Sequence, residues 1–183
     1  MTEPELDFAE VRRSFDHAAA RYDAHAVLQR EVCDRLLERL EFTALKPARV
    51  LDAGCGTGYG LAHLRARYAE SELCALDIAP AMLDAARARL PQATWARRAL
   101  QRLTPQASRV THLVCADMAR LPLAASSMNL VWSSLALQWC ELDTTFAESA
   151  RVLADDGLFL FTTFGPDTLW AQVRAGVDAL PWV

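Results

Sequence analysis

Two carboxylates and three glycines stand at the ends of two short apolar stretches, where they could hold a nucleoside. Asp52 lies in the apolar stretch 49–53, which runs directly into Gly54, Gly56 and Gly58. Glycine has no Cβ, so the backbone can turn sharply there and come within contact distance of a ligand. Asp77 follows the next apolar stretch, and a carboxylate at that place can accept hydrogen bonds from both hydroxyls of a ribose. The spacing predicts an adenosine-containing ligand.

One departure narrows the kind of ligand. The dinucleotide-binding fingerprint requires glycine or alanine at position 59, where this chain has Tyr59. The departure disfavours a cofactor that contains a pyrophosphate. In the alternative interpretation these residues form only a tight turn and a surface carboxylate, but this requires Asp52, the three glycines and Asp77 to coincide by chance.

The elements that must position these residues alternate between strand and helix. Apolar runs predict strands over residues 49–53, 73–76, 110–116, 130–133 and 157–163, the last after a turn at 155–157. Helices are predicted over 59–68, 80–90 and 144–153, with an extra helix in the long connection 91–109. This alternation is typical of a doubly wound α/β fold with a Rossmann-like, mostly parallel sheet. Ligands bind such sheets beyond the carboxyl ends of the strands, where the strand order reverses.

The first forty residues contain no glycine and carry apolar residues at helical spacing. They predict one helix over residues 8–20 and a second over 25–41, with a break at Tyr22 and Asp23.

Composition excludes several classes of protein. The 183 residues suit one domain, and a net charge of −4 gives no reason to expect nucleic acid as a partner. No stretch is apolar enough to span a membrane, and the acidic start does not match a signal peptide, so we expect a cytoplasmic protein. The five cysteines are scattered singly, without metal-ligand spacing, so no metal site is predicted.

The glycine-rich stretch resembles the first motif of class I S-adenosyl-L-methionine-dependent methyltransferases. Residues 52–58 read Asp-Ala-Gly-Cys-Gly-Thr-Gly, and residues 116–118 read Ala-Asp-Met. The resemblance implies that Asp52, Gly54 and Gly56 line the methionine end of the cofactor. It also implies that Asp77 and Ile78 bind the ribose.

The same resemblance implies that Asp117 accepts a hydrogen bond from the adenine amino group and that Met118 packs on the ring. The alternatives are a turn or helix-cap role for Asp117 and ordinary core packing for Met118.

Three further stretches, residues 14–29, 132–139 and 162–169, are similar to the malonyl-acyl-carrier-protein O-methyltransferases of biotin synthesis. In that family the amino-terminal helices cap the cofactor. The resemblance therefore implies that residues 1–41 form a lid, with Tyr22 over the methionine end and Phe15 beside it. In the alternative interpretation both aromatic side chains are helix core.

The implied activity is methyl esterification of malonyl carried on acyl carrier protein, with that carrier as the partner. No catalytic base is assigned, because a malonyl carboxyl with a pKa near about 4 is already ionised at neutral pH. The arginines between Asp84 and Asp117 form either a solvated face or a docking face for the acidic carrier. The alternative functions are methylation of another small-molecule or protein acceptor, or a non-catalytic, shortened paralogue that binds the cofactor.

The resemblance implies two further strands after strand five, whereas this chain stops at Val183. We expect a single domain over residues 1–183 whose core, residues 48–183, lacks these last two strands. With strand order 3-2-1-4-5, strand five becomes an apolar edge, and a helix over 167–180 would leave its backbone groups unpaired. We therefore expect the chain either to self-associate through strand five or to be marginally stable compared with a longer relative.

Overall fold

The computed structural model describes residues 7–90 and 110–165. Five strands form one parallel sheet in the order β3-β2-β1-β4-β5, as the sequence predicts. The strand order reverses between β1 and β4. The chain passes from β1 outward to β2 and β3, then returns to β4 and continues outward to β5. The strands are β1 Arg49–Ala53, β2 Glu72–Asp77, β3 Thr111–Cys115, β4 Met128–Ser134 and β5 Leu153–Thr162.

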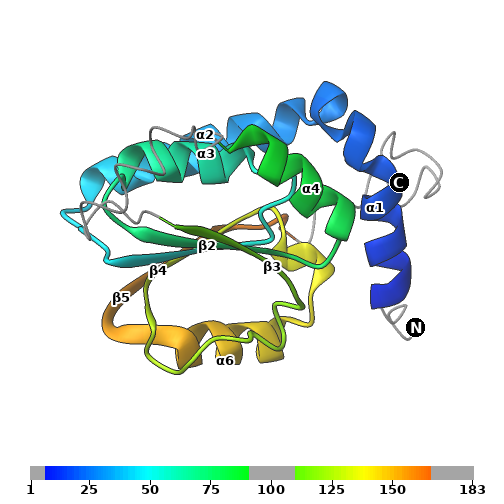
Figure 1. The fold of residues 1–183 in the computed structure, drawn as a ribbon. Helices are drawn as coiled ribbons and strands as arrows, with labels where there is room; N and C mark the ends of the chain where they lie inside the picture. The colour runs from blue at the N-terminus through cyan, green and yellow to red at the C-terminus, as the bar shows by residue number, and fades with distance from the viewer. Residues whose placement is uncertain (1–6, 91–109, 166–183) are drawn as a thin grey trace.

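Helices cover both faces of the sheet (Figure 1), which confirms the doubly wound α/β fold. One face is covered by α2 Val27–Arg39, α3 Tyr59–Arg67 and α4 Pro80–Arg89, and the other by α6 Leu142–Val152. Short helical turns are η1 Leu40–Phe42 and η3 Leu137–Trp139.

The central strand shows why its sequence is apolar without alternation. Successive side chains of a strand point to opposite faces, and on β1 both Val50 and Leu51 are fully buried, in separate cores. A parallel strand with helices on both faces must be apolar on both faces. The two cores fix where β1 ends and therefore where the glycines begin.

Helix α1, Phe8–His25, lies across the end of the sheet (Figure 1). It contains no buried residue. The predicted break at Tyr22 and Asp23 is wrong, because the helix continues to His25 and the bend is at Ala26. Asp23 does not cap a new helix, since its carboxylate binds Thr57 and Arg89 instead.

The predicted turn at residues 155–157 is also wrong. Strand β5 begins at Leu153, directly after α6, and these residues form an irregularity inside it. Met128 of β4 pairs with Leu153 of β5, and Leu130 pairs with Leu158. The interval is longer on β5, so its extra residues bulge out of the ladder. Residues that favour turns here produce a bulge. The helices predicted within 91–109 and over 167–180 lie outside the described residues.

Candidate functional site

The glycine loop follows β1 and is tied to the end of β2. The backbone N–H groups of Gly54 and Cys55 both donate to the carbonyl of Leu76, at 2.8 and 2.9 Å. Gly54 has φ +75° and lies so close to the loop after β4 that an added Cβ would stand 2.3 Å from the Cβ of Ala136. Gly56 has φ +53°, but an added Cβ would meet nothing within 4 Å. The first glycine is required for packing, and the second faces open space.

Asp77 holds this loop in place. Its Oδ2 accepts a hydrogen bond from the N–H of Gly56 at 2.8 Å, and its Oδ1 accepts one from the N–H of Ala79 at 2.9 Å. Burial raises the pKa of this carboxyl, although the two N–H donors partly offset the increase. Each oxygen retains a lone pair for a further donor.

Asp52 is a buried carboxylate with one unpaired oxygen. Its side chain is 3% exposed, and its Oδ2 has no hydrogen-bond partner. Burial, and then the charge of Asp77, raise its pKa to about 7. A buried oxygen without a donor is costly, so a donor from outside the protein would be bound favourably here.

A cleft with two lobes opens where the strands end. The lobe with mainly hydrophobic walls, here the apolar lobe, is lined by Phe8, Val11, Phe15, Tyr22, Gly54, Gly56, Leu76, Asp77, Ile78, Met82, Ala116, Asp117, Met118, Ser134, Leu135, Ala136, Trp139 and Cys140.

The second, the polar lobe, is lined by Tyr22, Asp23, Ala26, Gln29, Arg30, Cys33, Asp52, Gly54, Cys55, Gly56, Thr57, Tyr59, Gly60, Trp132 and Ser134. The two lobes share Tyr22, Gly54, Gly56 and Ser134. A ligand that filled both lobes would pass between the glycine loop and Tyr22.

Helix α1 provides the aromatic side of the cleft. The ring of Phe15 stands edge-on to Trp139, with centroids 5.5 Å apart, and lies 6.4 Å from the ring of Tyr22. Burial, with the nearby charges of Asp77 and Asp23, raises the pKa of Tyr22 to about 12. Its hydroxyl therefore keeps its proton and can act as a donor.

The remaining predicted residues have distinct positions. Asp117 lines the apolar lobe, and its Oδ1 also accepts a bond from the N–H of Ala119 at 2.8 Å. Ile78 and Met118 line the same lobe, and Met118 is 6% exposed. Gly58 lines neither lobe but packs against Ala86 of α4. Eight of the nine predicted residues thus lie around one cleft.

Several lining residues were not predicted from the sequence. Leu135 has φ +50°, a left-handed conformation that is rare for a branched residue and often found at functional sites. Gln29 lies on α2 and Trp139 in the short turn η3, and each ends one of the stretches similar to the O-methyltransferases. Their place in the cleft depends on tertiary packing, and the sequence analysis gives neither residue a role.

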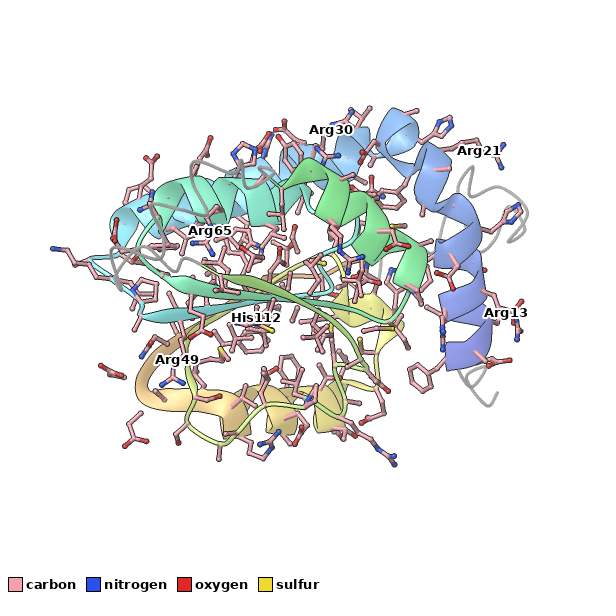
Figure 2. The ribbon with its side chains drawn as sticks, viewed as in Figure 1. Arg13, Arg21, Arg30, Arg49, Arg65 and His112 are labelled. Atoms are coloured by element: carbon pink, nitrogen blue, oxygen red, sulfur yellow. The ribbon has the colours of Figure 1, made fainter. Side chains whose placement is uncertain are left out.

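The three arginines of α1, Arg12, Arg13 and Arg21, line neither lobe of the cleft. Arg12 pairs with Asp16 at 3.9 Å, and Arg13 and Arg21 lie on the outer side of α1, away from the sheet (Figure 2). No histidine is among the described residues that line either lobe. Of the described residues, no cluster of three or more His, Cys, Asp or Glu could hold a metal ion. No described helix is long and apolar enough to cross a membrane.

Comparisons with known proteins agree with this geometry. A relative from Laribacter hongkongensis named malonyl-[acyl-carrier protein] O-methyltransferase is 54% identical over 176 residues, 94% of this chain and 57% of the relative. The chain therefore spans little more than half of that relative's length.

Solved structures share the fold. An S-adenosylmethionine-dependent methyltransferase from Mesorhizobium loti is 26% identical, with a TM-score of 0.55 over 72% of this chain and 53% of that one. A complex of the Haloferax volcanii Trm112 methyltransferase activator with a methyltransferase gives 25% identity and a TM-score of 0.65, over 81% of this chain and 59% of that one. The family model described as a methyltransferase domain matches residues 51–161, more than half of the chain. The chain therefore belongs to the methyltransferase domain family.

Proposed function

We propose that this chain is the cofactor-binding part of an S-adenosyl-L-methionine-dependent O-methyltransferase that esterifies malonyl carried on acyl carrier protein. One observation carries the proposal: a cleft at the strand ends places Asp77 in one lobe and the unpaired Oδ2 of Asp52 in the other. A ligand with a ribose at one end and an ammonium at the other suits both. The name of the relative from Laribacter hongkongensis supports the acceptor.

The apolar lobe suits the adenosine end of the cofactor. Asp77 and Ile78 would hold the ribose, Asp117 would accept from the adenine amino group, and Met118 would pack on the ring. Their common position in this lobe supports these roles. Apolar walls with a few convergent polar groups are typical of cofactor sites.

The polar lobe suits the methionine end. Gly54 and Gly56 would border this end, and Asp52 would accept from its ammonium through the oxygen that has no other donor. The bound cofactor supplies an activated methyl group. The reacting centre would lie where the lobes meet, beside Tyr22 and Ser134, which line both.

The chain's own residues would act by positioning the reactants. A malonyl carboxylate is ionised at neutral pH and needs no base, so alignment and exclusion of water are the main requirements. Residues 1–41 would act as a lid, with Tyr22 donating through its protonated hydroxyl and Phe15 packed against Trp139.

The partner would be acyl carrier protein that bears malonyl, in the cytoplasm. Of the arginine run proposed to dock it, Arg87 and Arg89 are described, and they pair with Asp84 and Asp23. The other arginines of the run lie outside the described residues.

Calorimetry tests cofactor binding. We expect micromolar affinity for S-adenosylhomocysteine and negligible affinity for NAD. Asp77→Ala should weaken binding by about 1.5–3 kcal/mol, the cost of losing hydrogen bonds to a charged group. The control is Asp84→Ala, which removes an exposed carboxylate on α4 and should leave the affinity unchanged. Equal affinity in the Asp77 variant would contradict the ribose assignment.

Turnover tests the acceptor. Methyl transfer to malonyl-acyl carrier protein should exceed transfer to other small acids or amines. Tight cofactor binding without transfer to any acceptor would instead support a non-catalytic, shortened paralogue.

A further inference from the structure

The polar lobe contains a second buried acceptor that has no partner. Among the described residues, four buried side-chain N or O atoms lack a hydrogen bond, and two of them, Asp52 Oδ2 and Gln29 Oε1, belong to residues that line this lobe. Gln29 comes from α2 and Asp52 from β1, so two different elements supply the acceptors. A buried acceptor without a donor costs about 1–3 kcal/mol. Two in one lobe indicate a ligand group with more than one donor.

Two donors of the lobe, Thr57 and Arg30, are directed towards Asp23 instead. The hydroxyl of Thr57 donates to Asp23 Oδ1 at 2.7 Å, and Arg30 donates to the carbonyl of Asp23 at 2.5 Å. An ammonium group has three N–H donors and can satisfy two acceptors at once.

We infer that Gln29 receives the α-ammonium group of the cofactor together with Asp52, and that Gln29 makes the site select ligands that carry this group. The inference rests on the proposed function and adds a binding residue outside the glycine loop. A neutral amide suits this position, because it adds an acceptor without adding charge. A second carboxylate in the lobe would add negative charge to a site where burial and the charge of Asp77 already raise the pKa of Asp52.

Two ligands separate this role from a general effect on the site. S-adenosylhomocysteine and 5′-methylthioadenosine share the nucleoside and the thioether, but only the first carries the amino-acid end. Gln29→Leu should weaken binding of S-adenosylhomocysteine about 10-fold to 100-fold, the range expected for a hydrogen bond to a charged group. It should change the affinity for 5′-methylthioadenosine less than about twofold.

Two further variants complete the experiment. Gln29→Glu keeps an acceptor and should retain more affinity for S-adenosylhomocysteine than the Leu variant does. Glu31→Leu, on the same helix but paired with Arg35 at 2.7 Å on the exposed side, should bind both ligands as the unmodified protein does.

Three results would overturn the inference. Equal losses for both ligands would show that Gln29 supports the whole cleft, and no loss would show that its oxygen does not meet the ligand. A Glu variant that binds as weakly as the Leu variant would show that an acceptor at this position is not sufficient to hold the ligand. If the unmodified protein binds neither ligand, the proposed function fails as well.

Discussion

Gly54 and Gly56 belong to one loop and both have positive φ angles, but their surroundings differ. Substitutions at the two positions should therefore affect protein stability and cofactor binding differently. Gly54→Ala would force a Cβ against Ala136 and should cost several kcal/mol of unfolding free energy. Gly56→Ala should cost only about 1–2 kcal/mol of left-handed strain, because its Cβ meets no atom within 4 Å. The added methyl group would enter the cleft and should weaken cofactor binding.

Urea unfolding of both variants, with calorimetry on the folded protein, checks this pair. Equal stability losses would contradict the contact of Gly54 with Ala136. Undiminished affinity in the Gly56 variant would show that the ligand does not pass over this residue.

Asp52 predicts a pH dependence of stability. Its pKa is about 7 in the folded protein, against about 3.9 in an unfolded chain. Between these values the folded state holds a proton that the unfolded state has released, so the contribution of Asp52 to stability falls as pH rises from about 4 to about 7. A change of this size is at most on the order of 4 kcal/mol.

Asp52→Asn removes this titration. The variant should gain stability relative to the unmodified protein as pH rises from 5 to 8, and it should bind S-adenosylhomocysteine more weakly. Urea unfolding of the ligand-free proteins at several pH values measures the difference. Parallel stability curves would show that the carboxyl titrates normally.

Besides the contact of Phe15 with Trp139, polar contacts fasten helix α1 to the glycine loop and to α4. Helix α1 has no buried residue, and Asp23 near its end binds the glycine loop through Thr57, at 2.7 Å, and α4 through Arg89. Earlier in the helix, Asp16 accepts from the N–H of Ala81 at 2.9 Å. An exposed ion pair contributes little to stability, so these contacts are suited to holding a lid that opens.

Weakening this attachment should speed ligand release. Asp23→Asn keeps an acceptor for Thr57 but loses the charge that attracts Arg89, so we expect release of S-adenosylhomocysteine to be about 3-fold to 10-fold faster, with a stability loss below about 1 kcal/mol. Higher salt should speed release from the unmodified protein more than from the variant. Stopped-flow release rates measure both effects, and Asp84→Asn, which affects only the exposed pair with Arg87, is the control. Equal release rates would show that α1 does not control access.

The helices and strands also show which structural features the sequence patterns can predict. The apolar runs predict all five strands, because a buried parallel strand must be apolar on both faces. The end of α1 was misplaced because Asp23, a residue that often starts a helix, binds a distant loop. The bulge in β5 was missed because its residues also favour turns, and only pairing with β4 distinguishes the two.

At the scale of the whole molecule, the strand order explains which part of the site was predictable. The glycine loop and Asp77 follow consecutive strands, so local sequence and one topological rule bring them together. Gln29 reaches the same cleft from α2 and Trp139 from η3, and their approach depends on how these elements pack on the finished sheet. Local patterns predict the ligand-facing end of the sheet, and only the resemblance to a known family points to Tyr22 and Phe15, which line the apolar lobe.

The sheet order also supports the prediction of self-association. Within residues 7–90 and 110–165, β5 is the last strand of the sheet, and it pairs with β4 on one side. Its side chains are apolar towards both cores, as predicted, with Leu160 in one and Phe159 in the other. Phe161 is 38% exposed and joins an aromatic cluster with Phe159. Among the described residues no strand pairs with the other side of β5, and an apolar strand edge readily pairs with a second copy.

We propose that β5 is an edge through which the chain self-associates. Phe161→Lys places a charge on this strand, a common way for proteins to protect an edge, and should shift the chain towards monomer. Phe42→Lys is the control, because Phe42 is the most exposed large apolar residue described, at 83%, and lies far from β5 in the sequence, in η1. Light scattering over a concentration series measures the mass of both variants. A monomeric unmodified chain would contradict self-association, and an equal shift in the two variants would place the contact on general apolar surface instead of β5.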